Sequence, residues 1–321
     1  MLLTEGLGLK KFMFKTSALI MIVLTILMIY NGIYNELRSD DQYGDGKFVH
    51  VPYEITISNT GSSHGVYAFD YSNYEGEQTG FNFALLSQTL SYDYRILREY
   101  EDHFKEGGIM FIPVSYPTFT WDETAGEDFE SKNERYYRFL SPSNIKEFDL
   151  GKYIGLHYFP ATYDSTAGVI KMFIKGILHR YPIIEDADYV GERYMDYAED
   201  ARKAYERHIR VDENGDMITN PEEIDALYDI ISFCRDHSIR PILISTPLRS
   251  EYLELYNQKI PDQFRSIIQR VQDTTGCEYY DYMHDDRFIH SDQYMRNADH
   301  LSPDGAIVFT EILMKEVKNN D

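Results

Sequence analysis

Short apolar runs of strand length alternate with longer stretches of helical periodicity along most of the chain. Residues 54–58 alternate between apolar and polar positions, 109–115 and 241–246 are almost continuously apolar, and 278–282 is a fourth run. Continuous apolar runs of this length are typical of strands buried on both faces of a parallel sheet. Because helical segments separate the runs, the pattern predicts an α/β fold, a three-layer α/β/α sandwich with a mainly parallel sheet.

The helices between these runs carry recognisable start signals. Asn220 is placed to cap a helix that begins at Pro221, since proline suits the first helical position. Ser302 and Pro303 open the last helix in the same way. Residues 81–104 predict a turn followed by a helix.

A segment near the N-terminus is long and apolar enough to cross a membrane. Residues 16–34 form a run of about 19 residues without a charge, close to the ~20 that a spanning helix needs. Basic residues precede the run and acidic residues follow it: Lys10, Lys11 and Lys15 on one side, Glu36, Asp40 and Asp41 on the other. Positive flanks stay in the cytoplasm, so 1–15 is predicted to be a cytoplasmic tail and the rest to face outward. A cleaved signal peptide and a buried helix are the alternatives; no small-x-small cleavage site follows the run.

The remainder is expected to form one folded domain on a short stalk. Residues 35–50 are polar and contain glycine, the composition of a flexible linker. The domain then covers 51–321, and within it 117–220 is rich in tyrosine and acidic residues and is interpreted as an inserted helical or cap region. Cys234 and Cys277 either form a disulfide or remain as two buried thiols.

The net charge excludes one class of partner. The chain has 53 acidic and 31 basic residues, a formal net charge of −22. Such a surface repels phosphate backbones, so nucleic acid is not an expected partner.

The stretch Gly61-Ser62-Ser63-His64 follows the first predicted strand directly. A serine on a strand-to-helix turn lies at the carboxyl edge of the sheet, where open α/β folds bind ligands. It becomes a nucleophile only when a base removes its proton, and His300, just before the last helix, lies at the same edge. Ser63 and His300 can therefore meet.

Taken alone, Ser62 and Ser63 would be interpreted as a polar turn and helix cap. His64 is assigned to packing or substrate contact.

These motifs, in this order, resemble those of the SGNH (GDSL-like) hydrolase superfamily. The resemblance rests on Gly61-Ser62-Ser63, on "FNFALLSQT" from residue 81, on the strand that ends at Ser115, and on "ADHLSPDGA" from residue 298. Within the superfamily it is strongest for the membrane-anchored bacterial branch that includes the D-alanyl-lipoteichoic acid transfer protein D. The implied fold is flavodoxin-like.

The resemblance implies roles for individual residues. Ser63 takes the position of the nucleophile and His300 that of the catalytic base. Ser87 falls where relatives have a glycine whose amide helps to bind the oxyanion, and Asn82 matches the asparagine before it. Ser115 falls in the block that usually presents an oxyanion asparagine, so a hydroxyl replaces that amide.

The third member of the triad departs from the family pattern. Relatives have an aspartate three residues before the histidine, and here that residue is Asn297. An amide does not stabilise an imidazolium as a carboxylate does. Asp299 or Asp281 could substitute for the missing aspartate, or Asn297 itself could orient the base.

The resemblance implies an outward-facing serine esterase or O-acyltransferase that acts on an envelope glycan or a teichoic-acid-like polymer, without a cofactor or a metal. It also implies a multipass membrane-bound O-acyltransferase as a partner. The alternative is a non-catalytic member that binds polysaccharide or serves as a scaffold subunit in an export complex.

Overall fold

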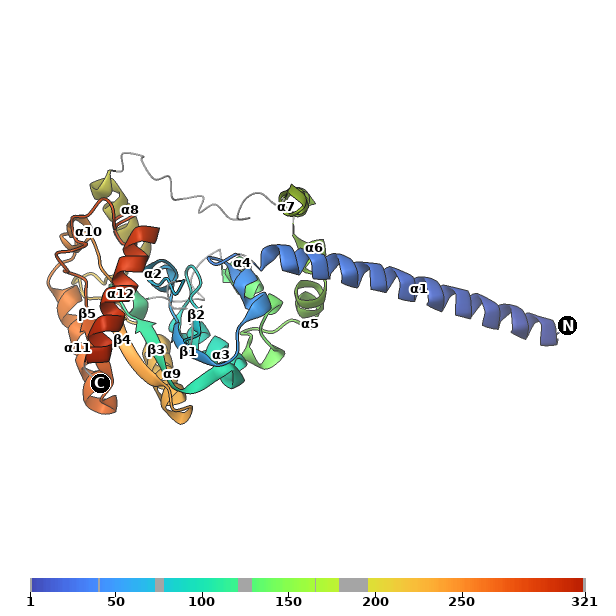
Figure 1. Ribbon diagram of the computed structural model, residues 1–321, viewed down its shortest axis with the longest axis horizontal. Coiled ribbons are helices and arrows are strands. Elements are labelled where there is room, and N and C mark those ends of the chain that lie inside the picture. Colours follow the sequence, from blue (N-terminus) through green and yellow to red (C-terminus); the bar gives the residue numbers. More distant parts are fainter. Residues whose placement is uncertain are drawn as a thin grey trace. The chain divides into compact units, whose positions relative to one another are not determined.

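The computed structural model describes residues 2–39, 41–72, 78–120, 129–164, 166–178 and 196–319. The chain divides into two compact units, each described here by itself (Figure 1). The sheet unit consists of Val51–Phe129 and Asp186–Asp321, and the helical unit of Met1–His50 and Glu130–Glu185.

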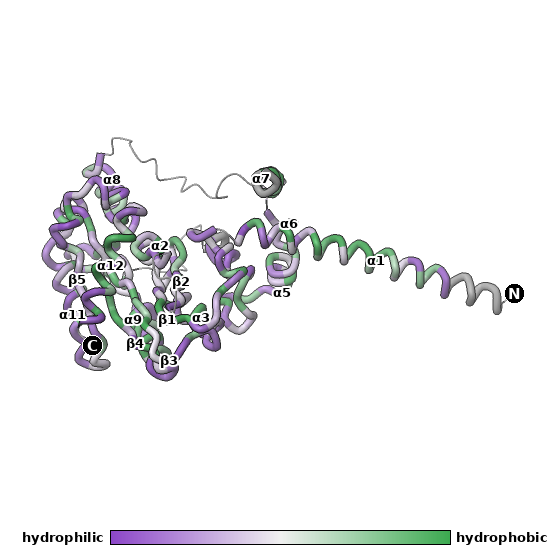
Figure 2. Tube along the Cα trace, viewed as in Figure 1, coloured by the Kyte–Doolittle hydropathy of each residue, from purple (hydrophilic) through white to green (hydrophobic). Residues whose placement is uncertain are grey.

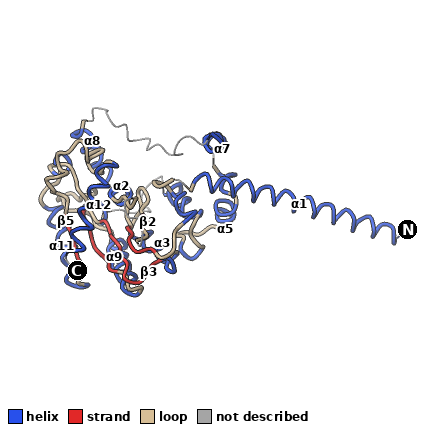
Figure 3. Tube along the Cα trace, in the orientation of Figure 1, coloured by secondary structure: helices blue, strands red, loops and turns tan. Residues whose placement is uncertain are grey.

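The sheet unit has the expected α/β fold. Among its described residues are the strands β1 (Ile55–Asn59), β2 (Gly80–Asn82), β3 (Phe104–Pro113), β4 (Arg240–Ser245) and β5 (Glu278–Asp281). Its helices are α2 (Ser63–Ala68), α3 (Leu90–Glu99), α8 (Tyr197–His208), α9 (Pro221–Asp236), α10 (Ser250–Leu253), α11 (Lys259–Thr275) and α12 (Pro303–Asn319), with 3-10 turns at η2 (Glu101–His103) and η3 (Tyr116–Phe119). All strand pairs are parallel, in the order β2-β1-β3-β4-β5. Figure 3 shows the strands in red among the blue helices.

Helices cover both faces of this sheet. On one face, α2 and α12 pack against Ile57, Phe111 and Ile242. Met110 and Leu243 are equally buried, and they point to the opposite face because side chains alternate along a strand. There α3 and α9 contact each other, and α9 also contacts β4. The unit is therefore a three-layer sandwich.

Four of the five strands correspond to predicted apolar runs, and the predicted helix starts are confirmed. The Asn220 side chain accepts a hydrogen bond from Glu222 N at 3.1 Å, and Ser302 Oγ accepts one from Gly305 N at 3.1 Å. The short edge strand β2 was not predicted, because three residues are too few to show a periodicity.

The two cysteines are free thiols. Cys234 and Cys277 are both buried and are not bonded to each other. Burial raises the pKa of the Cys277 thiol to about 11. The sequence allowed either a disulfide or two buried thiols, and the structure has two buried thiols.

The helical unit is built around the C-terminal part of a long first helix. Its elements are α1 (Leu2–Arg38), η1 (Asp45–His50), α4 (Phe129–Glu134), η4 (Arg135–Arg138), η5 (Pro142–Asn144), α5 (Leu150–Tyr153), the π-helical η6 (Ile154–Tyr158), α6 (Pro160–Tyr163) and α7 (Thr166–Leu178). Tyr34 of α1 forms a small core with Ala161 of α6 and Val169 of α7.

The greater part of α1 is apolar and exposed. Within Lys10–Arg38, a stretch of 18 residues has a mean hydropathy of 2.3 and no buried residue (Figure 2). By length and composition α1 can cross a membrane, a property that it shares with signal sequences.

The residues assigned to a flexible linker are structured. α1 continues to Arg38, whose guanidinium pairs with Asp45 at the start of η1. Phe48 is buried and stacks on Phe139 with ring centroids 4.0 Å apart. The polar composition of 35–50 indicated a linker, but burial of one aromatic ring and one ion pair holds this segment against the helical unit.

The proposed insertion at 117–220 does not form one body. Residues Glu130–Glu185 belong to the helical unit, whereas α8 and the residues that follow it belong to the sheet unit. Ala201 and Ala204 of α8 are buried there, which explains why this helix stays with the sheet. Within the predicted insertion, residues 121–128, 165 and 179–195 lie outside the described residues.

Candidate active site

The turn after β1 places Ser63 at the carboxyl edge of the sheet. β1 ends at Asn59 and α2 begins at Ser63 itself. Between them Gly61 has a φ of +113°, a conformation that favours glycine. Gly65 is also required, since a Cβ there would lie 2.3 Å from the carbonyl oxygen of Thr60. The two glycines allow α2 to start abruptly and to pack closely on the chain behind it.

The loop before α12 presents His300 at the same edge. Asn297 Oδ1 accepts a hydrogen bond from His300 N at 2.8 Å, which closes the loop locally. The backbone of Ala298 is held on two sides: its carbonyl accepts from Arg249 N at 3.0 Å, and its N–H donates to Asp200 Oδ2 at 2.8 Å. The loop is therefore fixed by two other segments of the sheet unit.

Ser63 and His300 meet across this edge, as the sequence predicts. Ser63 Oγ lies 2.7 Å from His300 Nε2, a hydrogen bond between residues 237 positions apart. His300 is 8% exposed, and Tyr67 packs edge-on against its ring. A serine hydroxyl that donates to Nε2 requires the neutral tautomer with the proton on Nδ1.

Both candidates for the orienting group contact the other ring nitrogen. His300 Nδ1 lies 3.1 Å from Asn297 Oδ1 in hydrogen-bonding geometry and 3.0 Å from Asp299 Oδ1. The amide oxygen can thus accept the Nδ1 proton while the carboxylate supplies a negative charge beside it. Asp281 takes no part: it is exposed, and its Oδ1 accepts from Met283 N at 3.0 Å.

Asp299 is a buried carboxylate surrounded by three imidazoles. It is 1% exposed. Its Oδ2 lies 3.6 Å from His208 Nδ1 and 3.9 Å from His64 Nε2, and His300 approaches Oδ1. His64 therefore packs against the Asp299 carboxylate. The sequence predicted a role in packing or substrate contact for this residue.

These surroundings fix the charge states of the cluster. Burial alone would raise the pKa of Asp299, but His300 and His64 outweigh it and hold that pKa well below its usual range. Burial lowers the pKa of His208 to about 3 and also lowers that of His64. At neutral pH the carboxylate is ionised, and His64 and His208 are neutral.

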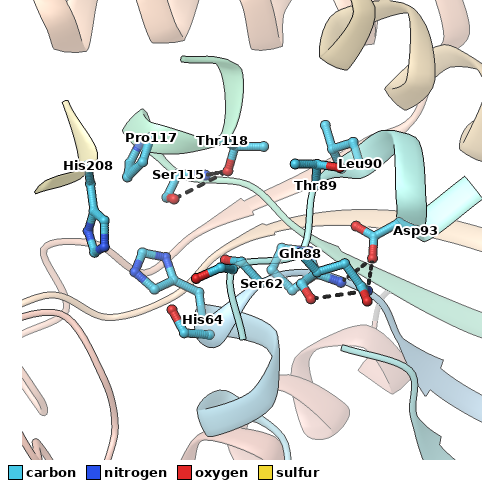
Figure 4. Close-up of a pocket in the computed structure, with 14 residues that line it drawn as sticks. Ser62, His64, Gln88, Thr89, Leu90, Asp93, Ser115, Pro117, Thr118 and His208 are labelled. Atoms are coloured by element: carbon cyan, nitrogen blue, oxygen red, sulfur yellow. Dashed lines mark hydrogen bonds between the residues drawn. The ribbon is translucent and has the colours of Figure 1, made fainter. Parts of the chain in front are cut away.

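A pocket of about 50 Å³ adjoins the serine. Its lining includes Ser63 and both predicted oxyanion positions, Ser87 and Ser115. Figure 4 shows His64 and His208 on one side of it, Gln88 and Asp93 on the other, and Ser115 bonded to Thr118.

The two predicted oxyanion residues reach this pocket in different ways. Ser87 has a φ of +54°, a left-handed conformation that favours glycine, the residue expected there from the family resemblance. Ser115 lines the pocket while both of its polar groups contact Thr118: its N–H donates to Thr118 Oγ1 at 2.9 Å, and its own Oγ lies 3.3 Å from the same oxygen.

Asn82 is not part of the pocket lining, unlike Ser63, Ser87 and Ser115. Its Nδ2 donates to the carbonyl of Gly65 at 3.0 Å, and its Oδ1 accepts from Asn59 Nδ2 at 2.9 Å and from Ala84 N at 3.0 Å. These bonds tie β1, β2 and α2 together. Asn82 thus holds the helix that carries Ser63 and is not placed to touch substrate.

Sequence reasoning missed a buried carboxylate that links two segments of the pocket lining. Asp93 Oδ1 accepts from Gly61 N at 2.9 Å and from Gln88 Nε2 at 2.5 Å. One side chain thus links the turn before Ser63 to the residue after Ser87. Asp93 lies on the buried face of α3, and an acidic residue among buried positions was the only available signal.

His64, Asp299 and His300 also place potential metal-ligand atoms within 4.8 Å of one another. Ligation would compete with the bonds already described, because His300 Nε2 bonds Ser63 and its Nδ1 faces Asp299. The arrangement fits proton transfer better than metal binding.

No protein-family model and no curated protein matches the chain. Matches among solved structures include a protein from Streptococcus pneumonia provisionally described as a platelet activating factor, with 12% identity and a TM-score of 0.39, covering 93% of this chain and 98% of that one. Another is a protein from Bacteroides fragilis provisionally described as an acylhydrolase, with 9% identity and a TM-score of 0.38, covering 85% of this chain and 93% of that one. A third is a GDSL-like lipase from Bacteroides thetaiotaomicron, with 10% identity and a TM-score of 0.38, covering 89% of this chain and 100% of that one. Similarity at this level leaves the assignment of function to the chemistry of the site itself.

Proposed function

We propose that the protein is a serine esterase or O-acyltransferase that works through an acyl-Ser63 intermediate. The observation that carries the proposal is the 2.7 Å hydrogen bond from Ser63 Oγ to His300 Nε2, with Asn297 and Asp299 behind Nδ1. A nucleophile bonded to a base that is itself oriented by a third group is the arrangement that activates a hydroxyl.

In the first half-reaction Ser63 Oγ attacks the carbonyl carbon of an ester, and its proton passes to His300 Nε2. The ionised Asp299 stabilises the imidazolium that forms. His300 then returns the proton to the oxygen of the leaving alcohol as the acyl–oxygen bond breaks. In the second half-reaction water or a sugar hydroxyl gives its proton to His300 and attacks the acyl-serine, and His300 returns the proton to Ser63.

The negative charge on the carbonyl oxygen needs donors in the pocket. The backbone N–H groups of Ser63 and Ser87 and the hydroxyl of Ser115 are the candidates, since all three residues line it. Each such donor contributes about 3 kcal/mol of transition-state stabilisation. A volume of about 50 Å³ corresponds to a few water molecules, which suits a short acyl group better than a long chain.

The first helix is proposed to be an uncleaved anchor. Asn31 and Tyr34 are buried in the helical unit, and Asn31 Oδ1 accepts from Ala161 N at 2.9 Å. A leader that is removed has no reason to contribute to the core of the mature protein. The basic residues before 16–34 then keep the N-terminus in the cytoplasm and place the sheet unit outside.

An outward-facing anchored esterase fits an envelope polysaccharide or a teichoic-acid-like polymer as acceptor. The resemblance to the membrane-anchored branch further implies a multipass O-acyltransferase that supplies the acyl group. These two assignments belong to the proposal and follow from location and resemblance.

The test is capture of the acyl-enzyme. The full chain in detergent is mixed with p-nitrophenyl acetate, quenched with acid and digested for mass spectrometry. We expect a burst of nitrophenol and an acetyl group on Ser63; Ser63→Ala abolishes both, whereas the matched Ser62→Ala retains them. An octanoyl ester should react much more slowly. A folded wild-type protein that gives neither burst nor adduct would support the non-catalytic binding or scaffold role instead.

A further inference from the structure

α7 of the helical unit has two apolar faces, and the structure uses one of them. Val169 is buried, and Met172 and Phe173 pack with it against Tyr30 and Tyr34 of α1. The rings of Tyr30 and Phe173 stack with centroids 5.3 Å apart. This face holds α7 at the C-terminal end of the apolar run of α1.

The other face of α7 is apolar and exposed. Ile170 and Ile174 are four positions apart, so they lie on one side of the helix, and they are 53% and 52% exposed. Side by side they form a contiguous exposed apolar patch, the kind of feature that marks a protein or membrane contact when it is extended. What covers this face is indicated by its neighbour, because the adjoining part of α1 is itself apolar, exposed and long enough to span a bilayer.

The direction of α7 agrees with a membrane surface. In Figure 1 α7 is seen end-on, whereas α1 runs across the picture, so the two contacting helices of this unit are not parallel. A spanning helix tilts on average only about 20° from the bilayer normal. If α1 crosses the bilayer, α7 must therefore lie nearly parallel to its surface.

Charge and aromatic content support the same surface. The thirteen residues of α7 include two lysines and no acidic residue, in a chain with a formal net charge of −22. Tyr158 of η6 and Tyr163 of α6 are 56% and 52% exposed in the same unit, and α6 contacts α1. Tyrosine is enriched at the membrane–water interface, and basic amphipathic helices bind anionic lipid headgroups there.

We infer that α7 is an interfacial helix that lies in the outer surface of an anionic bilayer, beside the point where α1 leaves it. The inference rests on the proposed anchoring of α1 and is independent of the proposed chemistry. Its occupant is lipid: the exposed isoleucines adjoin the apolar surface of the span, and the amino-acid sequence of α7 has a net positive charge, opposite to that of anionic headgroups. The helical unit is thereby held to the membrane at two places.

The experiment uses the full chain in nanodiscs of phosphatidylglycerol and phosphatidylethanolamine. Single cysteines are introduced as Ile174→Cys and, on the same face, Ile170→Cys, and are labelled with an environment-sensitive fluorophore. Cys234 and Cys277 are buried, and the unsubstituted chain reports any background labelling. The matched control is Ile218→Cys in the sheet unit, because Ile218 has the same 52% exposure. Ile26→Cys in α1 reports whether the anchor itself is in the bilayer.

We expect the labels at 170 and 174 to be blue-shifted and quenched several-fold more strongly by nitroxide-bearing lipid than the label at 218. Soluble iodide should show the reverse order. If the label at 26 is quenched by lipid but those at 170 and 174 behave like 218, α1 is an anchor and the interfacial helix is refuted. Self-quenching between copies without lipid quenching would assign this face to a second chain. Absence of lipid quenching at 26 would refute both the anchor and the inference.

Discussion

The assignment of Asp299 as the charged partner of His300 predicts a large loss of activity in Asp299→Asn. The carboxylate lies 3.0 Å from Nδ1, and at an effective dielectric of about 20 one pair of unit charges at that distance interacts with about 5 kcal/mol. Loss of this charge beside a developing imidazolium should lower kcat about 10⁴-fold, the loss known for removal of a triad carboxylate. KM should change little, since Asp299 does not line the pocket.

Asn297→Ala is the informative comparison, because Asn297 contacts the same nitrogen. It removes the hydrogen bonds of Asn297 Oδ1 to His300 N and Nδ1 but no charge, so we expect a loss of only about 10- to 30-fold. Asp286→Asn, the same charge change on an exposed residue, is the control. The assay is steady-state hydrolysis of p-nitrophenyl acetate, with thermal unfolding to verify that each variant folds. An Asn297→Ala variant as impaired as Asp299→Asn would refute the reasoning and make the amide the essential partner.

Three further predictions concern the frame of the site. Ser87→Gly relieves a left-handed backbone that costs roughly 1–2 kcal/mol and keeps the N–H, so it should raise the melting temperature and preserve activity, whereas Ser87→Val should lower it. The pKa of His208 in the folded state, about 3, lies below that of the unfolded chain, so the unfolded state takes up the proton first as the pH falls. Chemical denaturation should therefore show about 2 kcal/mol less stability at pH 5 than at pH 7 from this group, and His208→Gln should remove that part of the slope. Asp93→Ala leaves Gly61 N and Gln88 without their shared acceptor and should lower stability by about 2 kcal/mol together with kcat; unchanged melting and activity would show that the carboxylate is dispensable.

The sequence predicts the frame of the sheet unit well because buried parallel strands carry a strong local signal. Runs such as 109–115 and 241–246 have no other common explanation when helices separate them. The meeting of Ser63 and His300 follows from topology alone, since the carboxyl ends of parallel strands share an edge. Neither inference needs a side-chain conformation.

The details that the sequence did not predict depend on long-range packing. His208 and Asp200 reach the site from α8, which composition had assigned to an insertion, and their partners lie about 90 to 100 positions away. The sequence left open whether Asn297 or Asp299 orients His300, because the answer depends on the conformation of the short loop that carries all three residues. In the structure both side chains contact His300 Nδ1. The family resemblance placed Asn82 among the oxyanion and substrate residues, whereas its hydrogen bonds serve to hold α2.

The central claim is that Ser63 is an activated nucleophile. The most direct measurement is labelling of the full chain by a fluorophosphonate, beside Ser63→Ala, His300→Ala and the matched control Ser62→Ala. The account predicts covalent modification mapped to Ser63, retained in Ser62→Ala and lost in the other two variants. A folded wild-type chain that resists the reagent, or modification that survives Ser63→Ala, would contradict it.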